Sequence, residues 1–138
     1  MQVGHNVHIN RRAFIRAEGG LYIGDNVHIA SNVTIYTINH NYESTAIPYD
    51  QSFINKPVVI EKNVWIGVNV TIIPGVNIGE GAIIGAGTVV SNDVASLAVV
   101  GSAPARVIKY RNQNHYMKLD KEKLYGGING YLYGSDKI

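Results

Sequence analysis

Aliphatic residues recur every six positions along most of this chain, in runs that are separated by two interruptions. The residues that set this period are Val3, Ile9, Ile15, Ile23, Ile29, Ile35, Ile60, Ile66, Ile72, Ile78, Ile84 and Val90. An amphipathic strand repeats every two residues and a helix about every 3.6, so neither element explains a period of six. A short strand followed by a tight corner does explain it, and three such sides close one triangular coil.

A second interior position follows four residues after each of these, and it is often small or β-branched. Its residues are Val7, Ala13, Gly19, Val27, Val33, Asn39, Val64, Val70, Val76, Ala82, Thr88 and Val94. One coil cannot bury its own apolar face, so several coils must stack and pair their backbones. The pattern therefore predicts an all-β solenoid of parallel coils.

The two interruptions of the period mark bulges from the predicted solenoid. Two extra residues fall near Glu18-Gly19-Gly20, and the segment 41–57, NYESTAIPYDQSFINKP, is polar and aromatic. Insertions at the corners of a solenoid are tolerated and often carry function. We predict a β-helical domain over residues 1–105 with an inserted loop at 41–57. A partly helical tail over 106–138 follows, as a cap or an oligomer contact.

Composition agrees with a solenoid and excludes several classes of protein. The 138 residues include 18 Ile, 16 Val, 15 Gly and 14 Asn, which favour strands and turns with positive φ. A net charge of +2 is too small to suggest nucleic-acid binding, and the absence of Cys excludes an acyl-cysteine intermediate. No apolar run of about 18 residues could cross a membrane. No signal peptide is visible at the N-terminus, so we expect a cytoplasmic protein.

Five segments resemble those of a known family when they are taken in their order and spacing. They are TINHNY at 37–42, KPVVI at 56–60, VWIG at 64–67, IIPGVNIGEGAIIGAGTVV at 72–90 and GSAPARVIK at 101–109. The pattern resembles the hexapeptide-repeat acetyltransferases, in the sugar and surface-polysaccharide O-acetyltransferase branch that includes galactoside and maltose acetyltransferase-like enzymes. This resemblance implies a left-handed parallel β-helix. It also implies transfer of an acetyl group from acetyl-CoA to a hydroxyl, with no metal required.

The resemblance places a catalytic base at His40, at the root of the inserted loop. A hydroxyl is a weak nucleophile, and an imidazole with a pKa of about 6.5 can accept its proton and return it. The resemblance also implies acceptor contacts from Asn10, Glu18 and Trp65. A turn asparagine and a solvated glutamate explain the first two equally well. The acceptor itself is not specified by the residues, and an amine of an amino sugar is an alternative to a hydroxyl.

The donor side follows from the shape of coenzyme A, whose long arm ends in phosphates. Small residues allow the arm to approach the backbone, and cationic side chains bind phosphate. The positions that match the family here are Val68, Ala86, Ser91, Asn92, Arg106 and Lys109. A generic basic tail is the alternative explanation for the last two.

The remaining histidines and loop carboxylates leave other interpretations open. His8 and His28 occupy the same hexad position as Trp65, so all three should stack along one outward-facing corner. They could be plain surface residues or part of a metal site of the carbonic-anhydrase-like hexapeptide proteins. A solenoid without enzymatic activity is a further alternative. Glu43 and Asp50 could orient His40 or could simply stabilise the loop.

Counting sides in threes predicts how the site is assembled. His40 ends the third side of its coil, whereas Trp65 ends the first side of the next, so they lie at different corners of one prism. If both line one cleft, they come from different subunits. The family forms trimers with sites between neighbouring subunits, which implies a homotrimer with threefold symmetry. Each site would combine His40 of one chain with Trp65 and the GAGT turn of its neighbour.

Overall fold

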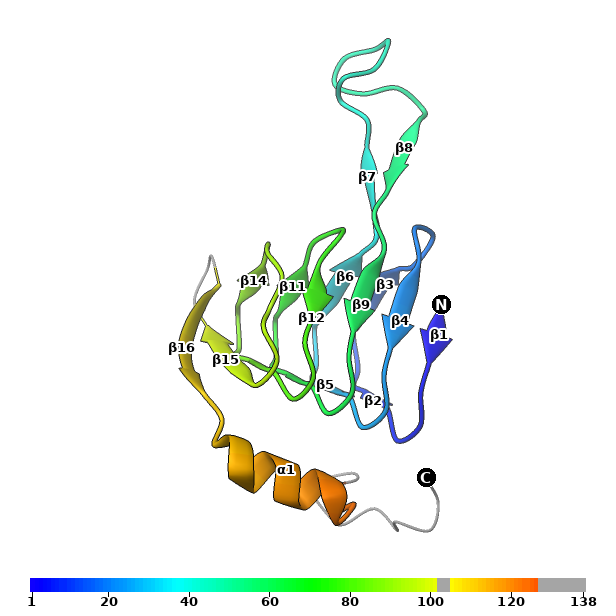
Figure 1. The fold of residues 1–138 in the computed structure, drawn as a ribbon. Helices are drawn as coiled ribbons and strands as arrows, with labels where there is room; N and C mark the ends of the chain where they lie inside the picture. The colour runs from blue at the N-terminus through cyan, green and yellow to red at the C-terminus, as the bar shows by residue number, and fades with distance from the viewer. Residues whose placement is uncertain (102–104, 127–138) are drawn as a thin grey trace.

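The chain winds into a triangular parallel β-helix in the computed structural model, which describes residues 1–101 and 105–126 (Figure 1). Sheet A contains β1 (Gln2–Val3), β4 (Leu21–Ile23), β9 (Val58–Ile60) and β12 (Asn77–Ile78). Sheet B contains β2 (His8–Ile9), β5 (His28–Ile29), β10 (Trp65–Ile66), β13 (Ile83–Ile84), β15 (Ala98–Gly101) and β16 (Arg106–Tyr110). Sheet C contains β3 (Phe14–Arg16), β6 (Thr34–Tyr36), β11 (Thr71–Ile72) and β14 (Val89–Val90). Each coil therefore adds one strand to each face of the prism.

The predicted sixfold period is confirmed by the core. Isoleucines at equivalent hexad positions pair in register between coils, as Ile29 does with Ile66 and Ile66 with Ile84. The eight that are at most 1% exposed are Ile23, Ile29, Ile35, Ile60, Ile66, Ile72, Ile78 and Ile84. Burying one such side chain contributes about 1.5–3 kcal/mol, so the stacked isoleucines hold the coils together.

The second interior position was predicted wrongly at the two interruptions. Gly19 lies in the turn before β4, and Asn39 is exposed on a projecting strand. Leu21 and Val58 fill the interior position instead, each two residues before the isoleucine of its own strand. The reason is that each coil resumes its register from the strand that follows an insertion.

The edges of the prism are built by residues with left-handed backbone conformation. We name the edges A–B, B–C and C–A after the sheets that meet there. On edge A–B, Asn6, Asn26 and Asn63 have φ of 52°, 57° and 62°. Asparagine tolerates this region because its short side chain bonds locally. The Asn6 Nδ2 donates to Asn26 Oδ1 and the Asn26 Nδ2 to Asn63 Oδ1, each at 2.9 Å, which forms a ladder of amides.

The inserted segment is a β-hairpin that projects from edge C–A, at the top of Figure 1. Strand β7 (Ile38–His40) pairs antiparallel with β8 (Phe53–Asn55). The Lys56 amide donates to the Thr37 carbonyl at 2.8 Å and closes the base of the hairpin. The excursion therefore begins three residues before the predicted loop, 41–57.

The tail begins as a strand, where only partial helix was predicted. Strand β16 pairs antiparallel with β15 and extends sheet B, and helix α1 (Gln113–Lys121) then runs along edge A–B (Figure 1). Asn112 caps α1 by accepting a hydrogen bond from the His115 amide at 2.9 Å. The predicted roles for residues 127–138 lie outside the described residues. Within the described part of the chain, no helix is long and apolar enough to cross a membrane.

A network of polar side chains fixes α1 to the solenoid. The buried Tyr116 hydroxyl accepts from Asn63 Nδ2 at 2.8 Å and donates to Glu80 Oε1 at 2.7 Å. Asp120 accepts from the same Asn63 amide at 2.9 Å and pairs with Lys62 at 3.1 Å. Burial raises the pKa of the Tyr116 hydroxyl, so it stays protonated and able to donate. The helix is thus anchored at the end of the asparagine ladder.

Candidate active site

His40 lies at the last position of β7, where the hairpin leaves the prism, and its side chain is exposed. The Tyr49 ring stacks on the imidazole with centroids 3.6 Å apart and an interplanar angle of 12°. The Phe53 ring, opposite His40 in the strand pair, lies 4.9 Å away. These aromatic contacts hold the imidazole in one orientation while part of it stays open to solvent, as a proton-transfer group requires.

The loop carboxylates stabilise the hairpin. Asp50 accepts hydrogen bonds from the Ser52 amide at 2.7 Å and from the Ser52 hydroxyl. The Ser52 hydroxyl is the main reason that the pKa of Asp50 is lowered. No hydrogen bond joins the His40 ring to Glu43, Asp50 or any other described side chain. Of the two roles considered for Asp50, the structure shows the one in the loop.

Glu18 lies on the same edge as the hairpin, in the turn between β3 and β4. Its carboxylate pairs with Arg16, with Nε and Oε1 2.6 Å apart, and both side chains are exposed. A backbone hydrogen bond at Glu18 and the Arg16 guanidinium lower the pKa of this carboxyl group. Ser91 and Asn92 follow β14 and reach edge C–A in a later coil. Glu18, His40, Ser91 and Asn92 therefore share one edge of the prism.

Trp65 stacks in register with His28 and His8, but on the flat face of sheet B rather than on a corner. The expected corner was wrong because these residues alternate with the buried isoleucines within their strands. The rings of His8 and His28 meet edge to face, 4.5 Å apart, and His8 Nε2 lies 2.9 Å from Asn6 Oδ1. Burial, and then the charge of His8, lower the pKa of His28. The described residues contain no cluster of three side chains that could bind a metal ion.

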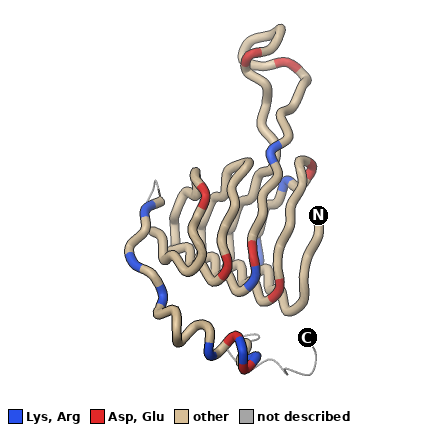
Figure 2. Tube along the Cα trace, in the orientation of Figure 1, with Lys and Arg blue, Asp and Glu red and all other residues tan. Residues whose placement is uncertain are grey.

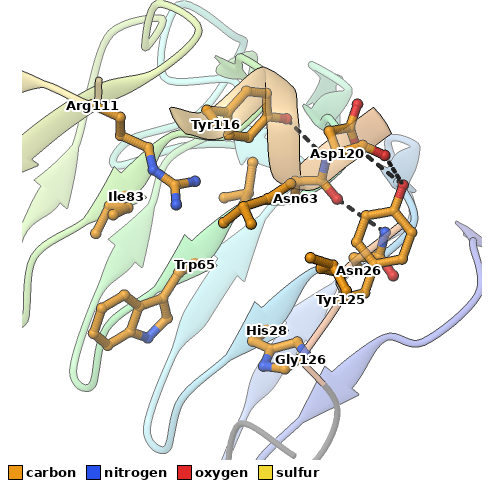
Figure 3. A pocket seen from close by; sticks show the side chains of 13 residues that line it. Asn26, His28, Asn63, Trp65, Ile83, Arg111, Tyr116, Asp120, Tyr125 and Gly126 are labelled. Atoms are coloured by element: carbon orange, nitrogen blue, oxygen red, sulfur yellow. Dashed lines mark hydrogen bonds between the residues drawn. The ribbon is translucent and has the colours of Figure 1, made fainter. Parts of the chain in front are cut away.

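A cavity of about 470 Å³ lies between α1 and sheet B (Figure 3). Trp65 and His28 form its floor, with the Trp65 side chain 58% exposed. Tyr116 and Tyr125 come from the C-terminal segment and face this floor. The Arg111 guanidinium donates to the Gly81 carbonyl at 3.3 Å at the edge of the cavity. Aromatic rings on opposite walls suit a ligand with flat apolar surfaces, such as a sugar ring.

Val68 and Ala86 occupy equivalent positions on edge B–C, one coil apart. The Gly87 amide donates to the Val68 carbonyl at 2.8 Å, which ties the two turns together. Both side chains are exposed, and Asn10 lies on the same edge near the start of the solenoid. These turns present small residues and backbone along a continuous strip, as expected for a surface that accommodates the arm of coenzyme A.

Arg106 and Lys109 project from β16, the outermost strand of sheet B. They lie opposite Gly101 and Val99 of β15, and both are exposed. Figure 2 shows basic residues following one another along β16 and into the segment before α1. This arrangement places two cations at the end of sheet B and leaves them free to bind phosphate.

The predicted site residues thus form two separate groups in one chain. One group surrounds the hairpin on edge C–A, and the other occupies sheet B and edge B–C. In a triangular prism, edge C–A lies opposite the face formed by sheet B. His40 and Trp65 therefore belong to different sides of the molecule, as the counting of hexads predicted.

Some residues of these surfaces were missed by sequence reasoning. Tyr49 and Phe53 belong to the aromatic insertion, but nothing in the spacing showed that they would enclose His40. Arg111, Tyr116 and Tyr125 belong to a tail without a repeat, so no period indicated that they would face Trp65. The number of aromatic residues in both segments was the available signal, and it does not specify a partner.

The fold and these two surfaces define a hexapeptide-repeat protein, and comparisons with known proteins agree. The family model described as "Bacterial transferase hexapeptide (six repeats)" matches residues 57–92. Galactoside O-acetyltransferase of Escherichia coli (strain K12) is 37% identical over 125 residues, which cover 86% of this chain and 59% of that enzyme. A galactoside acetyltransferase structure in complex with coenzyme A is 30% identical with a TM-score of 0.64. It covers 96% of this chain and 67% of that one.

A second kind of acyltransferase shares the fold. AntD, an N-acyltransferase from Bacillus cereus, solved in complex with dTDP-4-amino-4,6-dideoxyglucose and coenzyme A, is 26% identical with a TM-score of 0.73. It covers 84% of this chain and 66% of that one. This chain belongs to the family of bacterial hexapeptide-repeat transferases, and its fold is the left-handed parallel β-helix. It spans about 60% of the length of the Escherichia coli relative.

Proposed function

We propose that this protein transfers an acetyl group from acetyl-CoA to a hydroxyl of a sugar or of a surface-polysaccharide precursor. The observation that carries the proposal is the exposed His40 imidazole, held against Tyr49 at the root of the projecting hairpin. The similarity to galactoside O-acetyltransferase supports oxygen as the acceptor atom, because it is higher than the similarity to the N-acyltransferase.

In the proposed mechanism, transfer is direct. His40 accepts the proton of the acceptor hydroxyl as its oxygen attacks the thioester carbonyl carbon. The carbon–sulfur bond then breaks, and the imidazolium returns the proton to the departing thiolate of coenzyme A. General-base assistance of this kind contributes about 10²–10⁴ in rate. The chain contains no Cys that could carry the acetyl group.

The two groups of residues take different roles in this proposal. Asn10, Glu18 and Trp65 contact the acceptor, and the cavity beside Trp65 offers it aromatic walls. Val68, Ala86, Ser91 and Asn92 border the arm of coenzyme A. Arg106 and Lys109 bind its phosphates, because exposed cations on one strand can follow a phosphate-bearing tail. These assignments follow the family resemblance and the exposure of each side chain.

A homotrimer brings these groups together. His40 and Trp65 lie on opposite sides of one prism, so a single chain cannot place both against one acetyl group. Threefold symmetry places the hairpin edge of one protomer beside sheet B of the next and closes the assembly. Sedimentation should give about three times the monomer mass. Mixed trimers of His40→Ala and Trp65→Ala chains should recover activity through hybrid sites, and inactive mixed trimers would contradict the shared site.

The decisive experiment measures turnover of the His40→Ala variant. We expect thiol release from acetyl-CoA, with a panel of sugars as acceptors, to fall by about 10²–10⁴ while calorimetry shows that acetyl-CoA still binds. His115→Ala is the matched control, since His115 is also exposed but lies on α1. Normal turnover of His40→Ala would exclude His40 as the base. Preferential acetylation of amino sugars at nitrogen would assign the protein to N-acetyltransfer instead.

A further inference from the structure

The first coil exposes apolar residues whose counterparts in the second coil are buried. Val3 is 45% exposed and Ile9 is 39% exposed, whereas their register partners Ile23 and Ile29 are 0% and 1% exposed. Ile15 is also more exposed than its partner, Ile35. No residue among those described covers this end of the solenoid. The result is an apolar triangular face formed by the interior side chains of one coil.

The backbone of the same coil is also unpaired on one side. Strands β1, β2 and β3 are the terminal strands of sheets A, B and C. A terminal strand presents free amide and carbonyl groups that can pair with another chain, and an uncapped solenoid end adds apolar surface to this hazard. Both features call for a capping segment with apolar side chains and pairing backbone.

The C-terminal segment approaches this end step by step along edge A–B. The Arg111 amide donates to the Leu97 carbonyl at 3.0 Å, beside the last coil. Nine residues later, Asp120 accepts from Asn63 in the third coil. The Gly126 carbonyl then accepts from Asn6 Nδ2 at 3.4 Å, which is in the first coil. The chain therefore runs back along the prism, and Gly126 lies next to the open face.

The length and composition of the sequence after Gly126 suit a cap. Twelve residues follow it, and at about 3.3 Å per extended residue they can span roughly 40 Å. One coil occupies only about 4.8 Å of the axis, so the segment can cross the end of the prism. Ile128, Tyr131, Leu132 and Tyr133 supply apolar side chains.

We propose that residues 127–138 cap the first coil of the same chain, with their apolar side chains against Val3, Ile9 and Ile15. A second copy stacked end to end could cover the same face. The tail is favoured because Gly126 delivers it there at the high effective concentration of an intramolecular contact. The inference is independent of the proposed acetyltransferase activity, and its test uses no activity measurement.

Hydrogen exchange of the intact protein tests the cap. We expect slow exchange of amides in residues 1–16, and acceleration of about tenfold or more in a Tyr131→Ser, Leu132→Ser double variant. Exchange in residues 58–90 should not change, and the matched control Asp136→Ser, Lys137→Ser should behave like the unmodified protein. Equal exchange of residues 1–16 in the double variant and in the unmodified protein would overturn the proposal.

A disulfide identifies which chain supplies the cap. The natural sequence has no Cys, so Ile9→Cys with Leu132→Cys creates a single possible pair per chain. Oxidation should give an intrachain bond that leaves the mass of one chain on a denaturing, non-reducing gel. A disulfide between chains would overturn the proposal and assign the face to a second copy. Failure to form any disulfide under oxidising conditions would also count against it.

Discussion

The Gly67→Ala substitution tests how closely the coils pack at the VWIG segment. A Cβ built at Gly67 would lie 2.8 Å from the Ala86 amide nitrogen and 2.9 Å from the Ile84 carbonyl oxygen. Both atoms belong to the backbone of the next coil, so neither can rotate away. Ordinary contact begins at about 3.4 Å, so the two coils must separate locally by about 0.6 Å.

The cost of this separation follows from the hydrogen bond between the coils. The Gly67 amide donates to the Ile84 carbonyl at 2.8 Å, and a shift of 0.6 Å lengthens this bond to about 3.4 Å, outside the usual range. A weakened bond costs about 0.5–1.5 kcal/mol and overpacking adds about 1–3 kcal/mol. We therefore expect a loss of about 2–4 kcal/mol, or roughly 6–16 °C in Tm for a chain of this size.

Gly101→Ala is the matched control, because Gly101 occupies the same hexad position two coils later. The nearest atom to its added Cβ is Cδ1 of Ile108, at 2.8 Å. This atom ends an exposed, flexible side chain that can turn away, so we expect little change in Tm. Thermal unfolding followed by circular dichroism compares the two variants directly. If both unfold within about 2 °C of the unmodified protein, the coil spacing at Gly67 is not the constraint described here.

Three further outcomes are expected. Tyr116→Phe removes a hydroxyl that bonds an amide and a carboxylate, so the free energy of unfolding in urea should fall by about 1–3 kcal/mol. An unchanged value would show that the helix anchor lies elsewhere. Because the pKa of His28 is lowered in the folded protein, its contribution is complete above about pH 6.5 and is lost as the pH falls. His28→Gln should therefore reduce the difference in urea midpoint between pH 7.5 and pH 5.5, and an equal difference would exclude this residue as the cause. Arg106→Ala and Lys109→Ala should raise KM for acetyl-CoA more than they lower kcat, because distant phosphate contacts stabilise ground and transition states alike. Lys121→Ala on α1 is the control, and identical responses to dephospho-CoA donors would show that neither cation contacts the 3′-phosphate.

The solenoid was predictable because its signal is repeated many times. Ile66 and Ile84 each supply the same information, so a local irregularity does not obscure the period. The start of the hairpin was missed because Thr37 and Ile38 are buried although they do not fit the six-residue step. Their burial depends on the closing bond to Lys56, which is a contact across the insertion and leaves no trace in the local pattern.

The candidate site was predictable only as two separate sets of positions. The family motifs located His40 and Trp65, and hexad counting placed them on different sides of the prism. The stacking of Tyr49 on His40 depends on how the hairpin turns, and a polar, aromatic insertion of this length has many possible turns. The same limit applies to Arg111, which faces the cavity because α1 lies on edge A–B.

The position of α1 was nevertheless encoded in the repeat, in a form that only the structure makes legible. Asn6, Asn26 and Asn63 occupy one column of left-handed positions, and the next coil has Gly81 there, with φ of 70°. A Cβ at Gly81 would lie 2.7 Å from the ring of Tyr116, so an asparagine in that place would exclude the helix. Glycine opens the column at the point where the amide of Asn63 needs a new partner, and the Tyr116 hydroxyl supplies it. The same register that stacks the core thus ends the amide ladder and fixes the tail at this coil.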